Sequence, residues 1–135
     1  MSERPVVVTG AGGFIGAAAA RRYRAGGREV RGIDVAEATE PAVLAGDISA
    51  RGGWEAAFDG ADLVVHTAAL VSNTASAEEA WSVNVVGTRN VLDAACAARV
   101  RRVVVFSSAA VYSHRRADAV AEDSPVRPGD GTYGD

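Results

Sequence analysis

Three glycines at intervals of three residues form the clearest chemical signal in the sequence. Gly10, Gly13 and Gly16 stand where the β-branched run at residues 6–9 meets a run rich in alanine and arginine. At such a junction the first glycine permits a sharp turn, the second lets a pyrophosphate approach the backbone, and the third lets a helix pack closely. The N–H groups and positive dipole at the start of that helix attract phosphate. The motif therefore predicts a dinucleotide-binding turn rather than a plain turn.

Asp34 lies at the end of the next β-type run, at the distance where dinucleotide-binding folds place an acidic residue. A carboxylate there accepts hydrogen bonds from both adenosine ribose hydroxyls and repels a 2′-phosphate. Residues 35–40 contain no arginine that would bind such a phosphate. Asp34 alone could equally cap a loop, but after the glycine motif it favours NAD over NADP as the cofactor.

The elements that would position these residues alternate between strand and helix. Strands are predicted at residues 6–9, 29–35, 42–47, 61–69 and 101–108, and helices at 13–25, 53–60 and 77–98. Alternation of this kind favours parallel strands joined by right-handed crossovers. The fold class predicted is α/β, a Rossmann-type doubly wound parallel sheet with strand order 3-2-1-4-5, in one domain spanning 1–135.

Two features of these elements predict how they pack. The run at 61–69 is apolar along its length, as in a strand buried on both faces. In the long helix at 77–98, Trp81, Val85, Leu92 and Ala95 recur at near-helical spacing and are expected to form one buried stripe.

Composition excludes several classes of function. A chain of 135 residues with a net charge of −3 shows no general affinity for nucleic acid or for anionic membranes. No apolar run approaches membrane-spanning length, and no spacing of His, Cys, Asp and Glu suits a metal site. The single cysteine, Cys96, is expected to be a buried or half-buried thiol, and a cytoplasmic location fits best.

His66 follows the apolar run of the fourth predicted strand. It is better interpreted as a packed, hydrogen-bonded side chain than as a general base or metal ligand, because His114 is far away in the sequence.

Five motifs, in order along the chain, resemble the extended short-chain dehydrogenase/reductase family. They are "TGAGGFIG" at 9–16, "GDI" at 46–48, "HTAA" at 66–69, "NVVGT" at 84–88 and "SSAAVY" at 107–112. The family includes nucleotide-sugar epimerases, dehydratases and hydroxysteroid dehydrogenases. The resemblance covers essentially the whole chain and implies the N-terminal portion of an NAD(P)-binding Rossmann domain, a small-molecule substrate and a homodimer in the full-length protein.

The resemblance also implies which residues contact the cofactor. Asp47 would contact adenine, the backbone at 67–69 would lie along the cofactor, and Asn84 would support the site by binding nearby backbone. With the glycine motif and Asp34, the implied cofactor-binding set is Gly10, Gly13, Phe14, Ile15, Gly16, Asp34, Asp47, Ile48, Thr67, Ala68, Ala69 and Asn84.

Ser108 and Tyr133 are the catalytic residues that the resemblance implies. Ser108 would hydrogen-bond the substrate oxygen, and Tyr133 would take the hydroxyl proton while hydride passes to the nicotinamide. In the family this tyrosine begins a Tyr-x-x-x-Lys motif, whose lysine helps to lower the tyrosine pKa from about 10. The sequence stops at Asp135. We therefore expect the 135-residue chain to bind a dinucleotide without catalysing, and to expose an apolar edge beside the fifth strand.

The substrate stays open at this stage. Ala109 and Ala110 stand where sugar 4,6-dehydratases of the family carry an Asp-Glu pair, which argues against that dehydration. "SSAAVY" resembles the epimerase and sugar-dehydrogenase branches, so an NAD-dependent oxidoreductase or epimerase acting on a sugar-like alcohol is favoured. The alternatives are a hydroxysteroid or dihydroflavonol type of dehydrogenase/reductase, and a non-catalytic dinucleotide-binding module that senses redox state.

Overall fold

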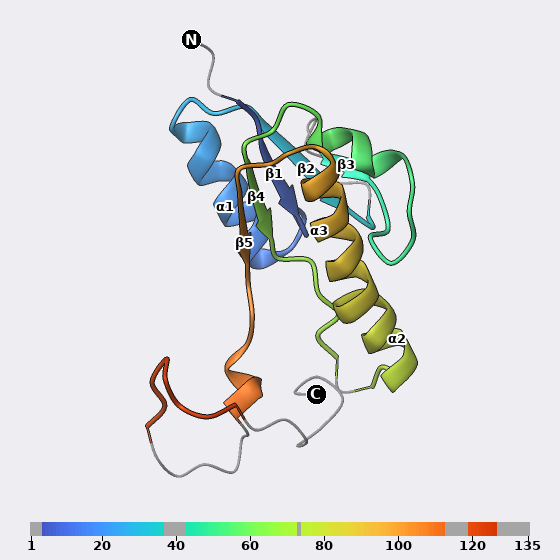
Figure 1. The fold of residues 1–135 in the computed structure, drawn as a ribbon, viewed down its shortest axis with the longest axis vertical. Coiled ribbons are helices and arrows are strands. Elements are labelled where there is room, and N and C mark those ends of the chain that lie inside the picture. Colours follow the sequence, from blue (N-terminus) through green and yellow to red (C-terminus); the bar gives the residue numbers. More distant parts are fainter. Residues whose placement is uncertain (1–3, 37–42, 73, 113–118, 127–135) are drawn as a thin grey trace.

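A parallel five-stranded sheet in the order β3-β2-β1-β4-β5 forms the centre of the fold (Figure 1). The computed structural model describes residues 4–36, 43–72, 74–112 and 119–126. The strands are β1 (Val6–Thr9), β2 (Val30–Asp34), β3 (Val43–Ala45), β4 (Leu63–His66) and β5 (Arg102–Val105). The predicted fold class and strand order are confirmed, and every strand lies within its predicted run.

Helical segments cover both faces of this sheet (Figure 1). On one face lies α1 (Phe14–Ala25). On the other lie the 3₁₀ helix η1 (Gly53–Phe58) and a continuous helical run made of α2 (Ala77–Trp81), the π-helical η2 (Ser82–Gly87) and α3 (Thr88–Ala97). A short 3₁₀ turn, η3 (Ala109–Tyr112), follows β5.

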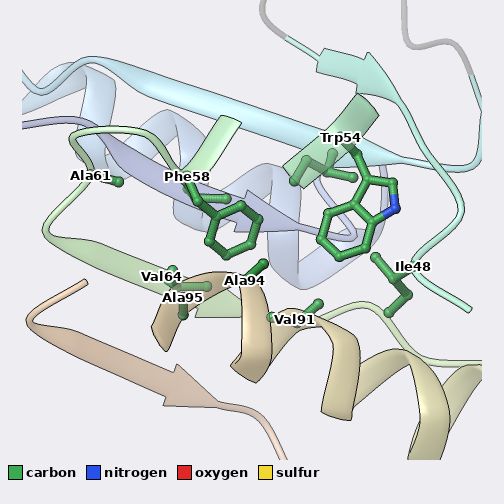
Figure 2. Close-up of a cluster of buried hydrophobic side chains, with 10 residues drawn as sticks. Ile48, Trp54, Phe58, Ala61, Val64, Val91, Ala94 and Ala95 are labelled. Atoms are coloured by element: carbon green, nitrogen blue, oxygen red, sulfur yellow. The ribbon is translucent and has the colours of Figure 1, made fainter. Parts of the chain in front are cut away.

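Alternate residues of the central strands enter the two cores. Val6 and Val8 of β1 pack with Ala20 beneath α1, whereas Val7 points to the other side. That second core contains Val64, Val91 and the edge-to-face pair Trp54 and Phe58, whose ring centroids are 5.9 Å apart (Figure 2). Because β1 and most of β4 are buried on both faces, the prediction of a doubly covered fourth strand is confirmed.

The buried stripe predicted for the long helix is wrong in two of its members. Trp81 and Leu92 are 61% and 42% exposed, although Ala95 is buried. The residues of this run that pack in the core under the sheet are small or β-branched, namely Val91, Ala94 and Ala95, and the buried Gly87 packs on Ile48. Small side chains let the helix approach the sheet closely, so the large apolar residues are turned outward.

Cys96 also departs from the prediction. It is exposed, although its neighbours Ala94 and Ala95 are buried. Adjacent residues on a helix point in different directions, so apolar sequence neighbours alone do not bury a side chain.

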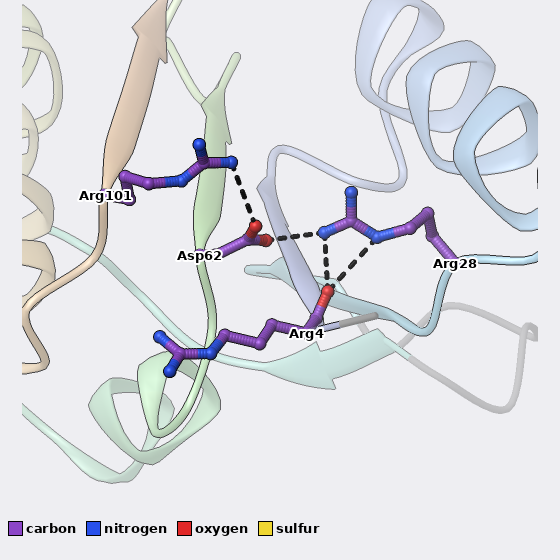
Figure 3. A network of polar contacts seen from close by, with 4 residues as sticks. All are labelled: Arg4, Arg28, Asp62 and Arg101. Carbon is purple, nitrogen blue, oxygen red and sulfur yellow. Dashed lines mark hydrogen bonds and ion pairs between the residues drawn. The ribbon is translucent and has the colours of Figure 1, made fainter. Parts of the chain in front are cut away.

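A polar network of Arg4, Arg28, Asp62 and Arg101 joins the strands where they begin (Figure 3). The glycine turn lies at the other end of the sheet, where β1 ends. Asp62 accepts hydrogen bonds from Arg28 at 2.5 Å and from Arg101 at 3.3 Å. Arg28 also donates to the Arg4 carbonyl oxygen. Partial burial raises the pKa of Asp62, but the two guanidiniums outweigh it and hold that pKa below its ordinary value.

Candidate functional site

A cleft of about 860 Å³ opens at the carboxyl ends of the central strands. It lies where β1 turns into α1, where β2 ends at Asp34, and where the chain leaves β4. In an open parallel sheet this is where the strand order reverses and where ligands bind. Its walls are Gly10, Gly12, Gly13, Phe14, Ile15, Gly16, Ile33, Asp34, Val35, Ala36, Gly46, Asp47, Ile48, Thr67, Ala68, Ala69, Leu70 and Val83.

The structure brings together every predicted cofactor-binding residue except Asn84 along this cleft. Asn84 does not line the cleft itself but contacts Leu70, which does. Its side-chain oxygen accepts a hydrogen bond from the Leu70 N–H at 2.7 Å, and its amide group donates to the Leu70 carbonyl at 3.1 Å. Asn84 therefore holds the backbone of Leu70, a residue that lines the cleft, and its role at a cofactor site stays a prediction.

The glycine turn is required by close contacts. Gly10 has a φ of +70°, and a Cβ there would come within 2.8 Å of the Ala68 nitrogen. A Cβ on Gly16 would overlap the Gly10 carbonyl oxygen. The first turn of α1 can therefore lie against the end of β1 only because both positions lack a side chain.

The start of α1 is open to an anion. Gly13 is its N-cap residue, no side chain caps the helix, and the first turn contains no acidic residue. The first hydrogen bond of the helix runs from the Ala17 N–H to the Gly13 carbonyl oxygen at 2.9 Å. The N–H groups of Phe14, Ile15 and Gly16 precede it and therefore have no partner within the helix. Together with the helix dipole, these groups suit a phosphate.

Asp34 faces the glycine turn and is tied to it. Its Oδ2 accepts a hydrogen bond from the Gly12 N–H at 2.9 Å, and its Oδ1 accepts one from the Ala36 N–H at 3.3 Å. Each carboxylate oxygen can accept a further bond. The carboxylate is thus fixed at the cleft wall with remaining acceptor capacity, as a ribose diol would need.

His66 is a buried link between three elements beneath the cleft. Its Nδ1 lies 2.6 Å from Thr9 Oγ1 at the end of β1, and its Nε2 lies 2.8 Å from Thr88 Oγ1 at the start of α3. Burial lowers the pKa of His66, so the neutral ring is favoured. The prediction of a packed, hydrogen-bonded histidine is confirmed, and the described part of the chain contains no cluster of side chains that could hold a metal ion.

Of the two catalytic candidates, only Ser108 lies within the described residues. Ser108 is half-buried just after β5, and its Oγ accepts a hydrogen bond from the Ala110 N–H at 3.2 Å. It is not among the residues that line the cleft. Tyr133 lies outside the described residues, so the pairing of Ser108 with Tyr133 stays a prediction.

Sequence reasoning missed several wall residues. The missed residues are Gly12, Ile33, Val35, Ala36, Gly46, Leu70 and Val83. Gly12 had a usable signal, because it stands inside the glycine motif and opposite the acidic residue at the end of β2. Leu70 and Val83 belong to the loop and helix after β4, where no local pattern indicates which residues face the cleft.

Comparison with known proteins assigns the family. A sequence model described as the NAD dependent epimerase/dehydratase family matches residues 6–134. The chain belongs to this family. A 3 beta-hydroxysteroid dehydrogenase/Delta 5-->4-isomerase of Mycobacterium tuberculosis is 38% identical to it over 118 residues, which is 78% of this chain and 32% of that protein. The chain therefore spans about a third of this curated relative's length.

Solved structures in the same superfamily share its fold. A short-chain dehydrogenase/reductase superfamily protein from Agrobacterium tumefaciens, crystallised with bound NAD, is 37% identical with a TM-score of 0.86, covering 96% of this chain and 40% of that one. UDP-glucose-4-epimerase from Stenotrophomonas maltophila, with bound NAD and formylated UDP-arabinopyranose, is 28% identical with a TM-score of 0.86, covering 98% and 45%. Within the ranges that the structure describes, no helix has the length and apolarity to cross a membrane.

Proposed function

We propose that this family member binds NAD in the cleft and forms the cofactor-binding part of an oxidoreductase or epimerase that acts on the alcohol of a nucleotide sugar. The observation that carries the proposal is that the uncapped start of α1 and the Asp34 carboxylate line the same cleft. The Gly12 N–H, in the turn before α1, donates a hydrogen bond to that carboxylate. The helix start suits a pyrophosphate and the carboxylate a ribose diol. The homodimer and cytoplasmic location expected from the sequence stay predictions.

Residues of the cleft and the two catalytic candidates have distinct tasks in this proposal. The N–H groups of Phe14, Ile15 and Gly16 bind phosphate oxygens, and Asp34 binds the adenosine ribose. Bound NAD supplies a hydride acceptor. Ser108 Oγ already accepts from the Ala110 N–H, so its own proton is available to a substrate oxygen, while Tyr133 takes the proton of the reacting hydroxyl.

The substrate class has one competing candidate. The mycobacterial relative named above is a 3 beta-hydroxysteroid dehydrogenase, which favours a steroid alcohol, whereas the Stenotrophomonas epimerase binds a UDP-linked sugar. Because the 135-residue chain is expected not to catalyse, the assays need a longer chain that includes a complete Tyr-x-x-x-Lys motif. In such a chain, NAD reduction with a 3β-hydroxysteroid, or interconversion of UDP-glucose and UDP-galactose, distinguishes the two substrate classes. Binding of NAD by that longer chain without turnover of either substrate favours the alternative of a non-catalytic dinucleotide-binding module.

The cofactor assignment is tested by titrating the protein with NAD and with NADP. We expect NAD to bind more tightly, and Asp34→Ala to weaken NAD binding about 10- to 100-fold, as expected for lost hydrogen bonds to a charged group. Asp59→Ala is the matched control, because Asp59 is exposed and lies outside the cleft. Equal or tighter binding of NADP by the unchanged protein would contradict the NAD assignment.

A further inference from the structure

The wall opposite the glycine turn is a short segment that packs on Trp54 of η1 and on the long helix, and a Cβ on Gly46 would lie 2.6 Å from Trp54 Cβ. Gly46, Asp47 and Ile48 follow the three-residue edge strand β3, and all three line the cleft. The Gly46 N–H donates to the Asp34 carbonyl at 2.8 Å. Asp47 Oδ1 accepts from the Ser49 N–H at 2.9 Å, which orients the carboxylate locally. These contacts shape the segment but do not set its distance from the long helix.

Contacts with that helix fix the segment from behind. The Asn90 side-chain amide donates to the Ile48 carbonyl oxygen at 2.9 Å. One turn earlier, a Cβ on Gly87 would lie 2.8 Å from Ile48 Cγ1, so the helix backbone packs directly on this side chain. Asn90 follows Gly87 by three residues and therefore shares its helix face. Both contacts converge on Ile48, which is buried.

We propose that Asn90 is a positioning residue that fixes the Asp47–Ile48 wall for recognition of the adenine base. The inference rests on the proposed function, because it takes the cleft to hold NAD. Asn90 is not among the residues that line the cleft, so it acts through Ile48.

The wall offers adenine a complementary pair of groups. Asp47 supplies a carboxylate acceptor, and no described residue accepts a hydrogen bond from the Ile48 N–H, which leaves a donor beside it. Adenine presents a 6-amino donor next to the N1 acceptor. Hypoxanthine presents the opposite pattern, a 6-carbonyl acceptor next to an N1–H donor. Displacement of this wall should therefore reduce discrimination between the two bases.

The experiment measures the affinities of NAD and of nicotinamide hypoxanthine dinucleotide for the protein and for Asn90→Asp and Asn90→Ala. Asn90→Asp keeps the shape but opposes a carboxylate oxygen to the Ile48 carbonyl, and Asn90→Ala removes the donor. We expect both changes to lower the ratio of the two affinities about 3- to 10-fold, the value of one hydrogen bond. Arg89→Ala, an exposed neighbour on α3, should leave the ratio unchanged.

Three results would overturn the inference. They are an unchanged ratio in folded Asn90 variants, an equal loss of affinity for both dinucleotides, and an unchanged protein that binds NAD without discriminating between the bases. If the unchanged protein binds neither dinucleotide, the proposed function fails as well. Thermal unfolding of each variant verifies that it is folded. If one of the two Asn90 variants does not fold, the affinity ratio is measured with the other.

Discussion

At the scale of single residues, one buried ring joins three elements beneath the cleft. The Thr9 Oγ1 that lies against His66 Nδ1 also accepts a hydrogen bond from the Ala68 N–H at 3.4 Å. A neutral ring has one donor and one acceptor nitrogen, so one of the Thr9 and Thr88 hydroxyls donates to the ring and the other accepts from it. A second proton on the ring would make both nitrogens donors, and the hydroxyl that donates to the ring would have to turn away. The sequence predicted a packed histidine but could not identify Thr9 and Thr88, because both partners are distant along the chain.

His66 should make the stability of the protein depend on pH. Burial lowers its pKa in the folded state below the ordinary value of 6.5, so the unfolded chain binds the proton more readily. The contribution of His66 to the free energy of unfolding is therefore complete above 6.5 and is lost as the pH falls below it. Denaturant unfolding measured from about pH 7.5 to about pH 5 should show this decline.

Two histidine variants separate this effect from other titrations. His66→Gln should remove the decline, and His114→Gln, which changes the other histidine in the sequence, should retain it. A decline of the same size in His66→Gln would show that other groups cause it.

At the scale of elements, the turn between β1 and α1 was predictable because its requirements are local. Glycines at fixed intervals after a β-branched run determine a turn without reference to the rest of the chain. The orientation of the long helix was not predictable in this way. The π-helical segment Ser82–Gly87 adds residues to a turn, so residues before and after it cannot be aligned by a regular period. The near-helical spacing that predicted a buried Trp81 was misleading for the same helix.

Gly16→Ala should disrupt the turn. The added Cβ would overlap the Gly10 carbonyl oxygen and lie 2.8 Å from Thr67 Oγ1, so α1 would have to move away from the sheet. We expect a loss of about 1–3 kcal/mol in the free energy of unfolding, together with weaker NAD binding. Gly53→Ala is the matched control, since nothing lies within 4 Å of a Cβ at that position. Equal stability of the two variants, measured by denaturant unfolding, would contradict the packing role of Gly16.

At the scale of the whole molecule, strand order and the place of the cleft followed from the alternation of strand and helix. That alternation constrains topology because parallel strands need crossovers of one hand. It does not reveal which surfaces stay uncovered. In the structure, Val104, Val105 and Phe106 at the β5 edge are 40%, 47% and 49% exposed, in agreement with the apolar edge expected there.

The exposed β5 edge should make the 135-residue chain self-associate. Burial of one such side chain contributes about 1.5–3 kcal/mol, so Val105→Lys or Phe106→Lys should weaken association about tenfold or more. Val120→Lys, which changes a similarly exposed valine away from β5, should have little effect. Sedimentation velocity over a range of concentrations measures the association. A chain that is monomeric at every concentration would refute this expectation.

The Asp62 network has a consequence for how the strands are aligned along one another. Parallel strands lack hairpin turns, so no local connection fixes which residues stand opposite each other. Each member of the network lies just before a strand: Arg4 before β1, Arg28 before β2, Asp62 before β4 and Arg101 before β5. Arg28 and Arg101 bind Asp62 directly, and Arg28 also binds the Arg4 carbonyl oxygen. A slip of one strand by one residue would shift its group by about 3.3 Å and strain or break its bond. The network therefore adds to the backbone ladders in favouring one alignment of four strands, in which Gly10, Asp34 and Thr67 lie at the same edge of the sheet.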